Sequence, residues 1–230
     1  QTQINPKVGL TFSQGLRAIL RQDPDIVLIG EIRDLETAEI AIQASLTGHL
    51  VLATVHTNDS VSAITRMIDM GVEPYLLAST LRGVLAQRLV RKLCTECKVS
   101  EKLNDDYKFL KKGSIINSPY GCEKCNNTGF KGRIGIFEMF NLSNEIKNLI
   151  NKNIDENELR ELVFSDQNTL FDSGLEMVKS GHTSIDEIIS ITKEWSLGAF
   201  NYIALDKKGK KESGTLSADN LDIARRELIS

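Results

Sequence analysis

Several residue types are scarce in this 230-residue sequence, which has one tryptophan, four prolines, four cysteines, three histidines and 6% aromatic residues. So few cysteines exclude a disulfide-dense mini-protein, and 41% apolar with 26% charged residues excludes collagen and wholesale disorder. No stretch approaches the roughly 20 apolar residues that span a bilayer, and we expect no charged-then-apolar leader. The first residue is Gln1 and the first methionine is Met67, so we expect a fragment.

Charge is nearly balanced overall but uneven along the chain. Residues 1–87 carry a net charge of −3, residues 88–133 carry +6, and residues 134–230 carry −6. A basic block between acidic flanks suggests contact with an acidic neighbour or with another copy of the chain. A solvated, lysine-rich loop region would give the same counts, so charge alone does not decide between the two.

All four cysteines lie inside the basic block, as two C-x2-C pairs formed by Cys94 and Cys97 and by Cys122 and Cys125. Two such pairs at this separation match the pattern in which four thiolates hold one Zn²⁺ tetrahedrally. Disulfides are the alternative, but the paired spacing favours metal. Four protein ligands leave no open position on the ion, so we expect a structural zinc site and no catalysis at the metal.

Apolar runs alternate with helical patterns in the first part of the chain. Residues 26–29 and 50–55 are short unbroken apolar runs, typical of strands buried on both faces of a parallel sheet. Helices are expected over residues 14–22, 35–46 (with Asp34 as N-cap), 60–70 and 74–88. This order predicts an α/β layered sheet with right-handed crossovers.

The second part of the chain reads as one strand followed by short helices and a hairpin. The strand is expected over residues 133–140, and the helices over residues 144–151, 156–164, 170–179 and 184–192. Residues 193–199 look like a junction. Beyond it, strands over 200–205 and 212–217 would form a hairpin, and a helix would begin near residue 220.

Two polar clusters follow the apolar runs, at the sheet edge where active sites of α/β proteins lie. Glu31 comes directly after the first run, where a carboxylate can organise Mg²⁺ or polarise an attacking water. His56 follows the second run and could hydrogen-bond a terminal phosphate or the lytic water. Three arginines near the same edge could neutralise phosphate charge, namely Arg17, Arg21 and Arg33. A surface carboxylate and a structural histidine remain alternatives for the two residues taken singly.

Longer stretches around these residues resemble a known family. The segment LRQDPDIVLIGEIRD (20–34) resembles the Walker B segment of the type II secretion and type IV pilus assembly ATPases, and LTGHLVLATVHTND (46–59) is similar to their His box. The resemblance covers roughly residues 1–192, including the four cysteines. The tetracysteine element points to the secretion and pilus-extension branch, because retraction motors of the superfamily generally lack it.

The resemblance implies a RecA-like motor that assembles as a cytoplasmic homo-hexamer, peripheral to the bacterial inner membrane. ATP hydrolysis with Mg²⁺ would drive assembly of pilin-like subunits through an inner-membrane platform protein and cytoplasmic assembly-platform proteins. It implies Glu31 as the catalytic carboxylate and His56 as the His-box residue near the γ-phosphate. His49 is a weaker member of that box, and the four cysteines are the zinc ligands.

Two features depart from a complete motor of this family. No G-x-x-x-x-G-K-[ST] segment occurs in the 230 residues, so the phosphate-cradling loop is absent and we expect negligible ATP hydrolysis by this chain. From about residue 199 the sequence resembles instead the N-terminus of the platform protein. A hairpin and helix native to the ATPase is the alternative for this tail.

The expected architecture is therefore a partial RecA-like P-loop NTPase core without its Walker A half, with three further parts. The core comprises residues 1–92, the tetracysteine zinc insert 93–133, the C-terminal helical subdomain 134–195, and the platform-like segment 196–230. A non-catalytic zinc-stabilised module that docks on the platform is the alternative function. Nucleic-acid binding is not expected, because the basic residues are mostly lysines spread along loops and the whole chain is acidic.

Overall fold

The computed structural model describes residues 12–103, 110–152, 155–192, 198–205 and 211–218. The chain divides into two compact units, each made of two separate segments. The first unit combines residues 1–87 with 137–169, and the second combines 88–136 with 170–230. The helical region expected over 134–195 is thus shared between the two units.

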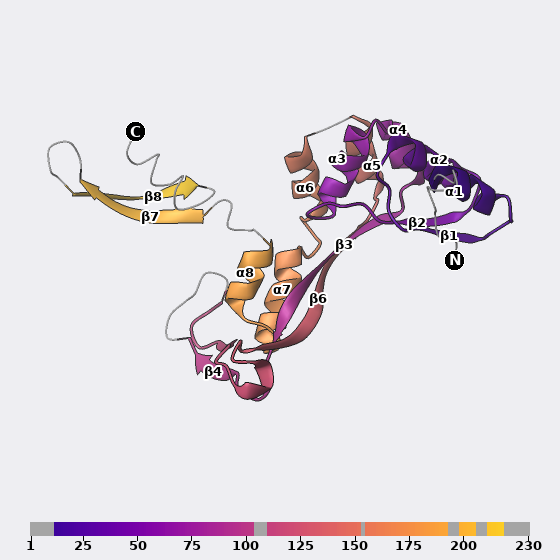
Figure 1. Cartoon of the computed structure of the whole chain (residues 1–230). Coiled ribbons are helices and arrows are strands. Elements are labelled where there is room, and N and C mark those ends of the chain that lie inside the picture. Colours follow the sequence, from indigo (N-terminus) through magenta and orange to yellow (C-terminus); the bar gives the residue numbers. More distant parts are fainter. Residues whose placement is uncertain (1–11, 104–109, 153–154, 193–197, 206–210, 219–230) are drawn as a thin grey trace. The chain divides into compact units, whose positions relative to one another are not determined.

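A parallel pair of short strands forms a sheet in the first unit (Figure 1). Strand β1 (Ile26–Ile29) pairs with β2 (Leu50–Ala53) in a register that sets Ile29 opposite Ala53 at their carboxyl ends. Both strands lie on the apolar runs, as predicted. The pairing brings the segments that follow the two strands to the same edge of the sheet.

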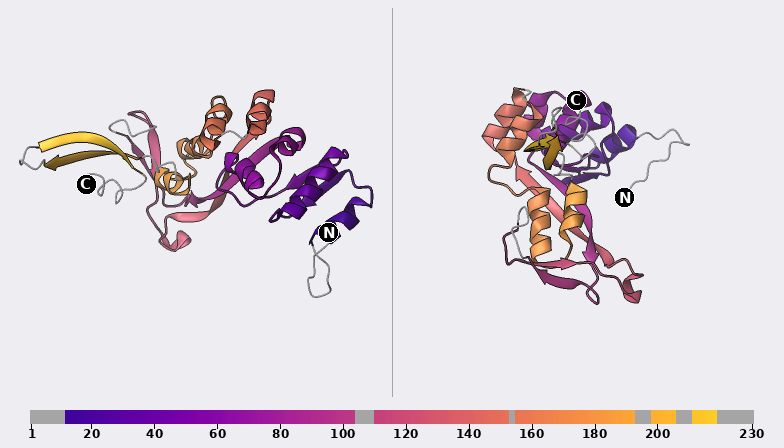
Figure 2. Two further views of the ribbon diagram at one scale, coloured as in Figure 1. Left: turned by 90° about the horizontal axis from the view of Figure 1, so that it is seen from above. Right: turned by 90° about the vertical axis from the view of Figure 1, so that its left-hand side faces the viewer.

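Helices α1 (Phe12–Leu20) and α2 (Leu35–Leu46) belong to the first unit (Figures 1 and 2). Their buried residues form an apolar core with those of the strands. The side chain of Asp34 accepts a hydrogen bond from the backbone N–H of Thr37 at 2.8 Å, which caps the start of α2 as predicted. The helix ends at Leu46, two residues before Gly48, whose φ of 102° suits glycine.

Burial of β1 differs from the expectation that both of its faces are covered. Val27 and Ile29 are 5% and 2% exposed, whereas Ile26 and Leu28 are 60% and 73% exposed. Successive side chains of a strand point to opposite faces, so one face of β1 meets the core and the other is open. Among the described residues, no element covers this second face of the β1–β2 pair.

The helix expected over residues 74–88 is shorter than predicted. After α3 (Val61–Asp69), helix α4 covers only Pro74–Thr80, and residues 83–93 form the long strand β3 (Gly83–Leu93). Proline at the first position of α4 supports its start, as predicted. The remaining residues 81–88 were wrongly assigned to a helix.

Pairing with a distant strand explains this error. β3 pairs with β6 (Phe130–Asn141), which contains the strand predicted over residues 133–140. At Gly83 an added Cβ would lie 3.1 Å from the carbonyl oxygen of Phe140, so the two backbones approach closely there. A partner that lies far along the chain decides the conformation of residues 83–88, and local periodicity cannot reveal it.

Two short helices complete the first unit after β6. Ser143 caps α5 (Asn144–Asn151) by accepting a hydrogen bond from Ile146 N at 3.2 Å, and Asp155 caps α6 (Glu156–Val163). Both helices were predicted. Their inward residues join the same core as the strands and as helices α1 to α4.

The described part of the second unit holds one end of the β3–β6 pair, two further strand pairs and two helices, and a short 3-10 turn carries the second cysteine pair. Its elements are β4 (Val99–Lys102), β5 (Ile115–Ser118), the 3-10 turn (Glu123–Cys125), α7 (Leu170–Lys179), α8 (Ile185–Thr192), β7 (Gly198–Leu205) and β8 (Lys211–Ala218). β4 and β5 are antiparallel, with Val99 opposite Ser118. Helices α7 and α8 follow the predicted spans.

The α7–α8 connection is bonded to the strand that leads into the cysteines. Leu93 N–H donates to the carbonyl of His182, and Thr183 Oγ1 donates to the carbonyl of Arg91, both at 2.8 Å. The Arg91 backbone N–H and guanidinium donate to the buried carboxylate of Glu187 at 2.9 and 2.6 Å. These bonds join the two sequence segments of the second unit.

Strands β7 and β8 form the antiparallel pair expected in the tail, with Gly198 opposite Ala218 and Leu205 opposite Lys211 (Figures 1 and 2). The hairpin turn, the helix expected from residue 220 and most of the junction expected over residues 193–199 lie outside the described residues. A search of the described residues finds no helix that is both long and apolar enough to cross a membrane.

Close packing of α7 on α8 makes a first prediction. A Cβ added to Gly174 would lie 2.7 Å from Cγ2 of Ile188, a fully buried side chain. Overpacking costs about 1–3 kcal/mol, and the better helix propensity of alanine offsets about 1 kcal/mol. We therefore expect Gly174→Ala to lower the free energy of unfolding in urea by up to about 2 kcal/mol. In an Ile188→Ala background the penalty should vanish, and an equal penalty there would contradict the contact.

Candidate functional site

The loops after β1 and β2 lie together at the carboxyl edge of the sheet. The backbone N–H of Ile32 donates to the carbonyl of Thr54 at 2.9 Å, and Thr54 Oγ1 donates to the carbonyl of Gly30. The parallel pairing thus continues beyond the strands themselves. It places Glu31 and His56, which are 25 positions apart in sequence, next to each other.

Glu31 lies between two cationic or potentially cationic side chains. Arg33 forms an ion pair with its Oε1 atom, and His56 Nε2 lies 2.8 Å from its Oε2 atom. The His56 contact has the distance of a hydrogen bond without its geometry, and buried Oε2 has no hydrogen-bond partner among the described residues. The Glu31 side chain is 28% exposed, whereas those of Arg33 and His56 are 73% and 86% exposed. The carboxylate is therefore set back beneath two solvent-facing side chains.

Electrostatics keep the Glu31 carboxylate ionised. The hydrogen bond from Arg33 lowers the pKa of Glu31, burial raises it, and His56 adds a further lowering, so the net direction is downward. A carboxylate that is ionised at neutral pH can accept a proton from water or coordinate a divalent cation. It cannot serve as a proton donor.

The other predicted site residues lie elsewhere in the first unit. Arg17 in α1 pairs with Glu36 of α2 at 3.1 Å, and Arg21 is exposed after α1. His49 lies at the amino end of β2, opposite to the end that His56 follows, and its Nδ1 is 3.0 Å from the carbonyl oxygen of Ala44. The structure does not bring these three side chains into the cluster of Glu31, Arg33 and His56.

The four cysteines of the second unit converge on one point. Their Sγ atoms all lie within 4.8 Å of one another, and all four are free thiols. The separations are 3.9 Å for Cys94–Cys122, 3.8 Å for Cys97–Cys125 and 3.8 Å for Cys122–Cys125. A disulfide bond needs about 2.05 Å, so the structure has no disulfide among these residues.

Backbone N–H groups surround the cysteine sulfurs. Cys125 Sγ accepts from the N–H groups of Cys122 and Gly129 at 3.2 and 3.3 Å. Burial raises the pKa of the Cys125 thiol, but these donors outweigh it and the pKa falls to about 6. For Cys97 burial dominates and the pKa rises to about 11. Gly129 has a φ of 75°, and a Cβ added there would lie 2.4 Å from Cβ of Pro119. Glycine therefore allows the backbone at this position to lie close to Pro119 while its N–H group donates to Cys125 Sγ.

The donor set fits a tetrahedral soft-metal site. Zinc–sulfur bonds of about 2.3 Å arranged as a tetrahedron place sulfur atoms about 3.8 Å apart. Three of the sulfur separations match this value to 0.1 Å. N–H donors to sulfur also stabilise thiolates, the form that binds metal.

A polar network that the sequence did not predict lies just beyond His56. Arg160 of α6 donates to Asp59 at 2.9 Å and to Glu156 at 3.0 Å. Glu138 of β6, which is 4% exposed, accepts from both the backbone N–H and the hydroxyl of Ser60 at 2.7 Å. One sequence signal was available, because Glu138 occupies an inward position of the alternating strand β6.

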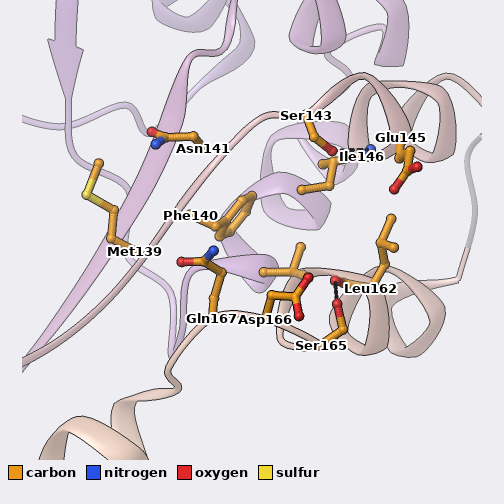
Figure 3. Close-up of a pocket in the computed structure, with 11 residues that line it drawn as sticks. Met139, Phe140, Asn141, Ser143, Glu145, Ile146, Leu162, Ser165, Asp166 and Gln167 are labelled. Carbon is orange, nitrogen blue, oxygen red and sulfur yellow. Dashed lines mark hydrogen bonds between the residues drawn. The ribbon is translucent and has the colours of Figure 1, made fainter.

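A cavity of about 460 Å³ lies elsewhere in the first unit, where the end of β6 meets α5 and α6 (Figure 3). Phe140 and Ile146 form its apolar wall, while Glu145 and Asp166 stand at its edge. None of the predicted site residues lines it. It is therefore separate from the Glu31 cluster.

Comparison with known families now identifies the class of this chain. The family model described as "Type II/IV secretion system protein" matches residues 1–190, and the chain belongs to this family. A second model, "Type II secretion system protein F, N-terminal domain", matches residues 198–230. Both parts of the resemblance expected from the sequence are thus confirmed.

Individual relatives agree with this assignment. The chain is 49% identical over 199 residues to "Type II secretion system ATPase E" of Vibrio cholerae, covering 84% of this chain and 40% of that protein. It is 51% identical over 195 residues to "Type II secretion system protein HxcR" of Pseudomonas aeruginosa, covering 84% and 39%. The chain thus spans about 40% of the length of the curated relatives it matches.

Solved structures support the fold. The "Pilus Retraction Motor PilT and Bound ADP" matches with a TM-score of 0.57 and 27% identity, covering 79% of this chain and 43% of that one. The Yersinia pseudotuberculosis ATPase DotB matches with a TM-score of 0.58 at 22% identity, covering 79% and 40%, which bears on the fold alone. The part of the chain that these structures cover therefore shares the fold of the PilT motor.

The Asp59–Arg160 pair makes a prediction about acid stability. Burial raises the pKa of Asp59, but hydrogen bonds from Ser62 and Arg160 outweigh it and hold the pKa below its ordinary value. A lowered carboxyl pKa stabilises the fold above the unfolded pKa of about 3.9, and this stability is lost as pH falls through the native value. Arg160→Met raises the native pKa, so the stability is lost at higher pH.

We expect acid unfolding of Arg160→Met, followed by circular dichroism, to have its midpoint at higher pH than the wild-type chain. The free energy of unfolding at pH 7 should fall by about 1.5–3 kcal/mol, the contribution of a hydrogen bond to a charged group. Arg66→Met, at an exposed position of α3, is the matched control and should leave both values unchanged. Identical acid midpoints for the two variants would contradict the role of the pair.

Proposed function

We propose that this chain is part of the ATP-hydrolysing motor that powers assembly of a type II secretion pseudopilus or a type IV pilus. The observation that carries the proposal is the meeting of Glu31 and His56 at the carboxyl ends of adjacent parallel strands. Active sites of open α/β sheets lie at this edge. Membership of the family and the likeness to the PilT motor support the same reaction class.

Each residue of the cluster has a role in this proposal. Glu31, held ionised, accepts the proton of the attacking water or holds Mg²⁺ beside the phosphates of ATP. His56 faces the terminal phosphate, and Arg33 keeps the Glu31 carboxylate charged. Arg17, Arg21 and His49 remain proposed nucleotide contacts. They do not lie in the cluster within this chain, so they could contact a nucleotide bound there only in the complete hexamer.

The chain alone lacks one part of the machinery. No G-x-x-x-x-G-K-[ST] segment occurs in it, and this loop supplies the backbone N–H groups and lysine that hold the phosphates. We propose that the remaining part of the complete motor supplies them, so residues 1–92 act as part of a RecA-like core. Residues 134–195 are proposed as the C-terminal helical part of the motor, with their helices divided between the two compact units.

Zinc is the proposed occupant of the cysteine cluster in the 93–133 insert. Support comes from the four converging sulfurs and from separations that fit a tetrahedron. With four protein ligands the ion would have no open position, so its role is structural. It would fix the loops that connect β3, β4, β5 and β6.

The C-terminal segment of the chain indicates the partner that we propose. Residues 198–230 match the N-terminal domain of secretion protein F, so we propose that this segment acts at the inner-membrane platform, on its cytoplasmic side. The motor part would assemble as a homo-hexamer, and no nucleic-acid partner is proposed. A non-catalytic module that docks on the platform is the alternative, favoured by the closed cysteine set and the missing phosphate loop.

The ATPase proposal predicts a specific loss of turnover. In the complete motor, Glu31→Gln should retain ATP binding and lower kcat at least about 100-fold, since it removes the group that activates water. Glu39→Gln, at an exposed position of α2, is the matched control and should retain turnover. The 230-residue chain assayed beside them should hydrolyse ATP negligibly. Unchanged turnover in Glu31→Gln would overturn the role of Glu31. Robust turnover by the 230-residue chain would instead overturn the expectation that this chain is inactive alone.

The zinc proposal predicts the metal content. Elemental analysis of the purified chain should give about one zinc per molecule, and Cys122→Ser should lose it because three thiolates bind the ion more weakly. Thr95→Ser changes an exposed residue between two of the cysteines and serves as the control. A fully folded wild-type chain without metal would refute the proposal.

A further inference from the structure

We propose that Glu138 and Arg160 are positioning residues that hold the His56 loop, defined as residues 54–60, so that His56 faces Glu31. This inference rests on the proposed function, because it assigns the residues that orient a site group in the motor. Neither residue touches the Glu31 cluster itself. Both act on the backbone that carries His56.

The His56 loop depends on bonds from outside itself. It connects β2 to α3 without regular structure, and one bond within it runs from Thr57 Oγ1 to the carbonyl of Asp59 at 3.0 Å. The His56 side chain is 86% exposed, so packing does little to orient it. At its first end the loop is bonded to the β1 segment through Thr54. The second end needs an equivalent anchor.

Glu138 supplies one anchor at residue 60. Its Oε1 atom accepts from the N–H and from the hydroxyl of Ser60, which is 1% exposed. The neighbouring inward residues of β6, Ile136 and Phe140, are apolar and fully buried. A carboxylate between them is costly to bury, but it gives a directed, charge-assisted bond at the start of α3, where the helix dipole favours negative charge.

Arg160 supplies the other anchor at residue 59. Its guanidinium bonds Asp59 Oδ2 at 2.9 Å, while Asp59 Oδ1 accepts from the backbone N–H of Ser62 at 2.8 Å and so caps α3. Glu156 holds the guanidinium in place at 3.0 Å and also accepts from Thr65 at 2.8 Å. Two consecutive loop residues are therefore fixed by α6 and by β6, three and four positions after His56.

A purely structural role would lower stability without altering the geometry of His56. The chain offers a matched control, because Glu187 is a carboxylate buried like Glu138 that accepts a backbone N–H from a distant segment of the second unit. Glu187→Gln should cost stability in the same way. It should leave the site of the first unit unchanged.

The first measurement uses the 230-residue chain and its three histidines, His49, His56 and His182, as NMR reporters. We expect Glu138→Gln and Arg160→Met to move the imidazole signals of His56 while those of His182 stay in place. Glu187→Gln should leave His56 unmoved. If either of the first two variants fails to fold, Ser60→Ala or Arg160→Lys replaces it. An unmoved His56 in folded variants of both residues overturns the proposal.

The second measurement uses the complete motor. Displacing a site group by a fraction of an ångström to 1 Å lowers kcat by about tenfold to a hundredfold, so Glu138→Gln and Arg160→Met should lower kcat to that extent with KM for ATP unchanged. Arg160→Lys should recover part of the loss, and Glu187→Gln should not lower kcat. If Glu31→Gln abolishes turnover but Glu138→Gln and Arg160→Met do not lower it, the positioning proposal fails alone. If Glu31→Gln also turns over normally, the proposed function fails, and the His56 signals still decide the positioning.

Discussion

The parallel pairing of β1 with β2 is the constraint on which the Glu31 cluster depends. Its register sets Ile29 opposite Ala53, and the bond from Ile32 N–H to Thr54 extends the pairing past both strands. A slip of one residue would turn Val27 and Ile29 out of the core and expose them, so apolar burial fixes the register. The same burial therefore fixes which polar residues meet at the sheet edge.

Local sequence patterns were sufficient for elements that are decided locally. Apolar runs marked β1 and β2, and the capping residue Asp34 marked the start of α2. The patterns failed at residues 81–88, where pairing with β6 overrides a helical periodicity that continues from α4. Local patterns also did not reveal that one face of β1 is exposed, because burial depends on which elements pack over a strand.

The sequence pointed to the polar residues of the candidate site, but it did not reveal the residues that hold the His56 loop. Glu31, Arg33 and His56 lie in recognisable segments, and strand order alone brings them to one edge. Glu138 and Arg160 lie 78 and 101 positions from their partners in the loop, beyond the reach of any periodic pattern. Conversely, His49 shares a segment with His56 but lies at the other end of β2. Nearness in sequence was a poor guide there, because a strand separates the residues at its two ends.

Both units use the same device to join segments that are distant in sequence. In the first unit a buried carboxylate, Glu138, accepts the backbone N–H of Ser60 at 2.7 Å, and in the second unit Glu187 accepts that of Arg91 at 2.9 Å. Each bond links the two sequence segments that make up its unit. Apolar packing between segments has no direction and tolerates small shifts, whereas a charged acceptor on a backbone N–H fixes one residue against another. Because unpaired buried charge is costly, a shifted arrangement would lose more than the bond itself, so these carboxylates select one alignment of the two segments.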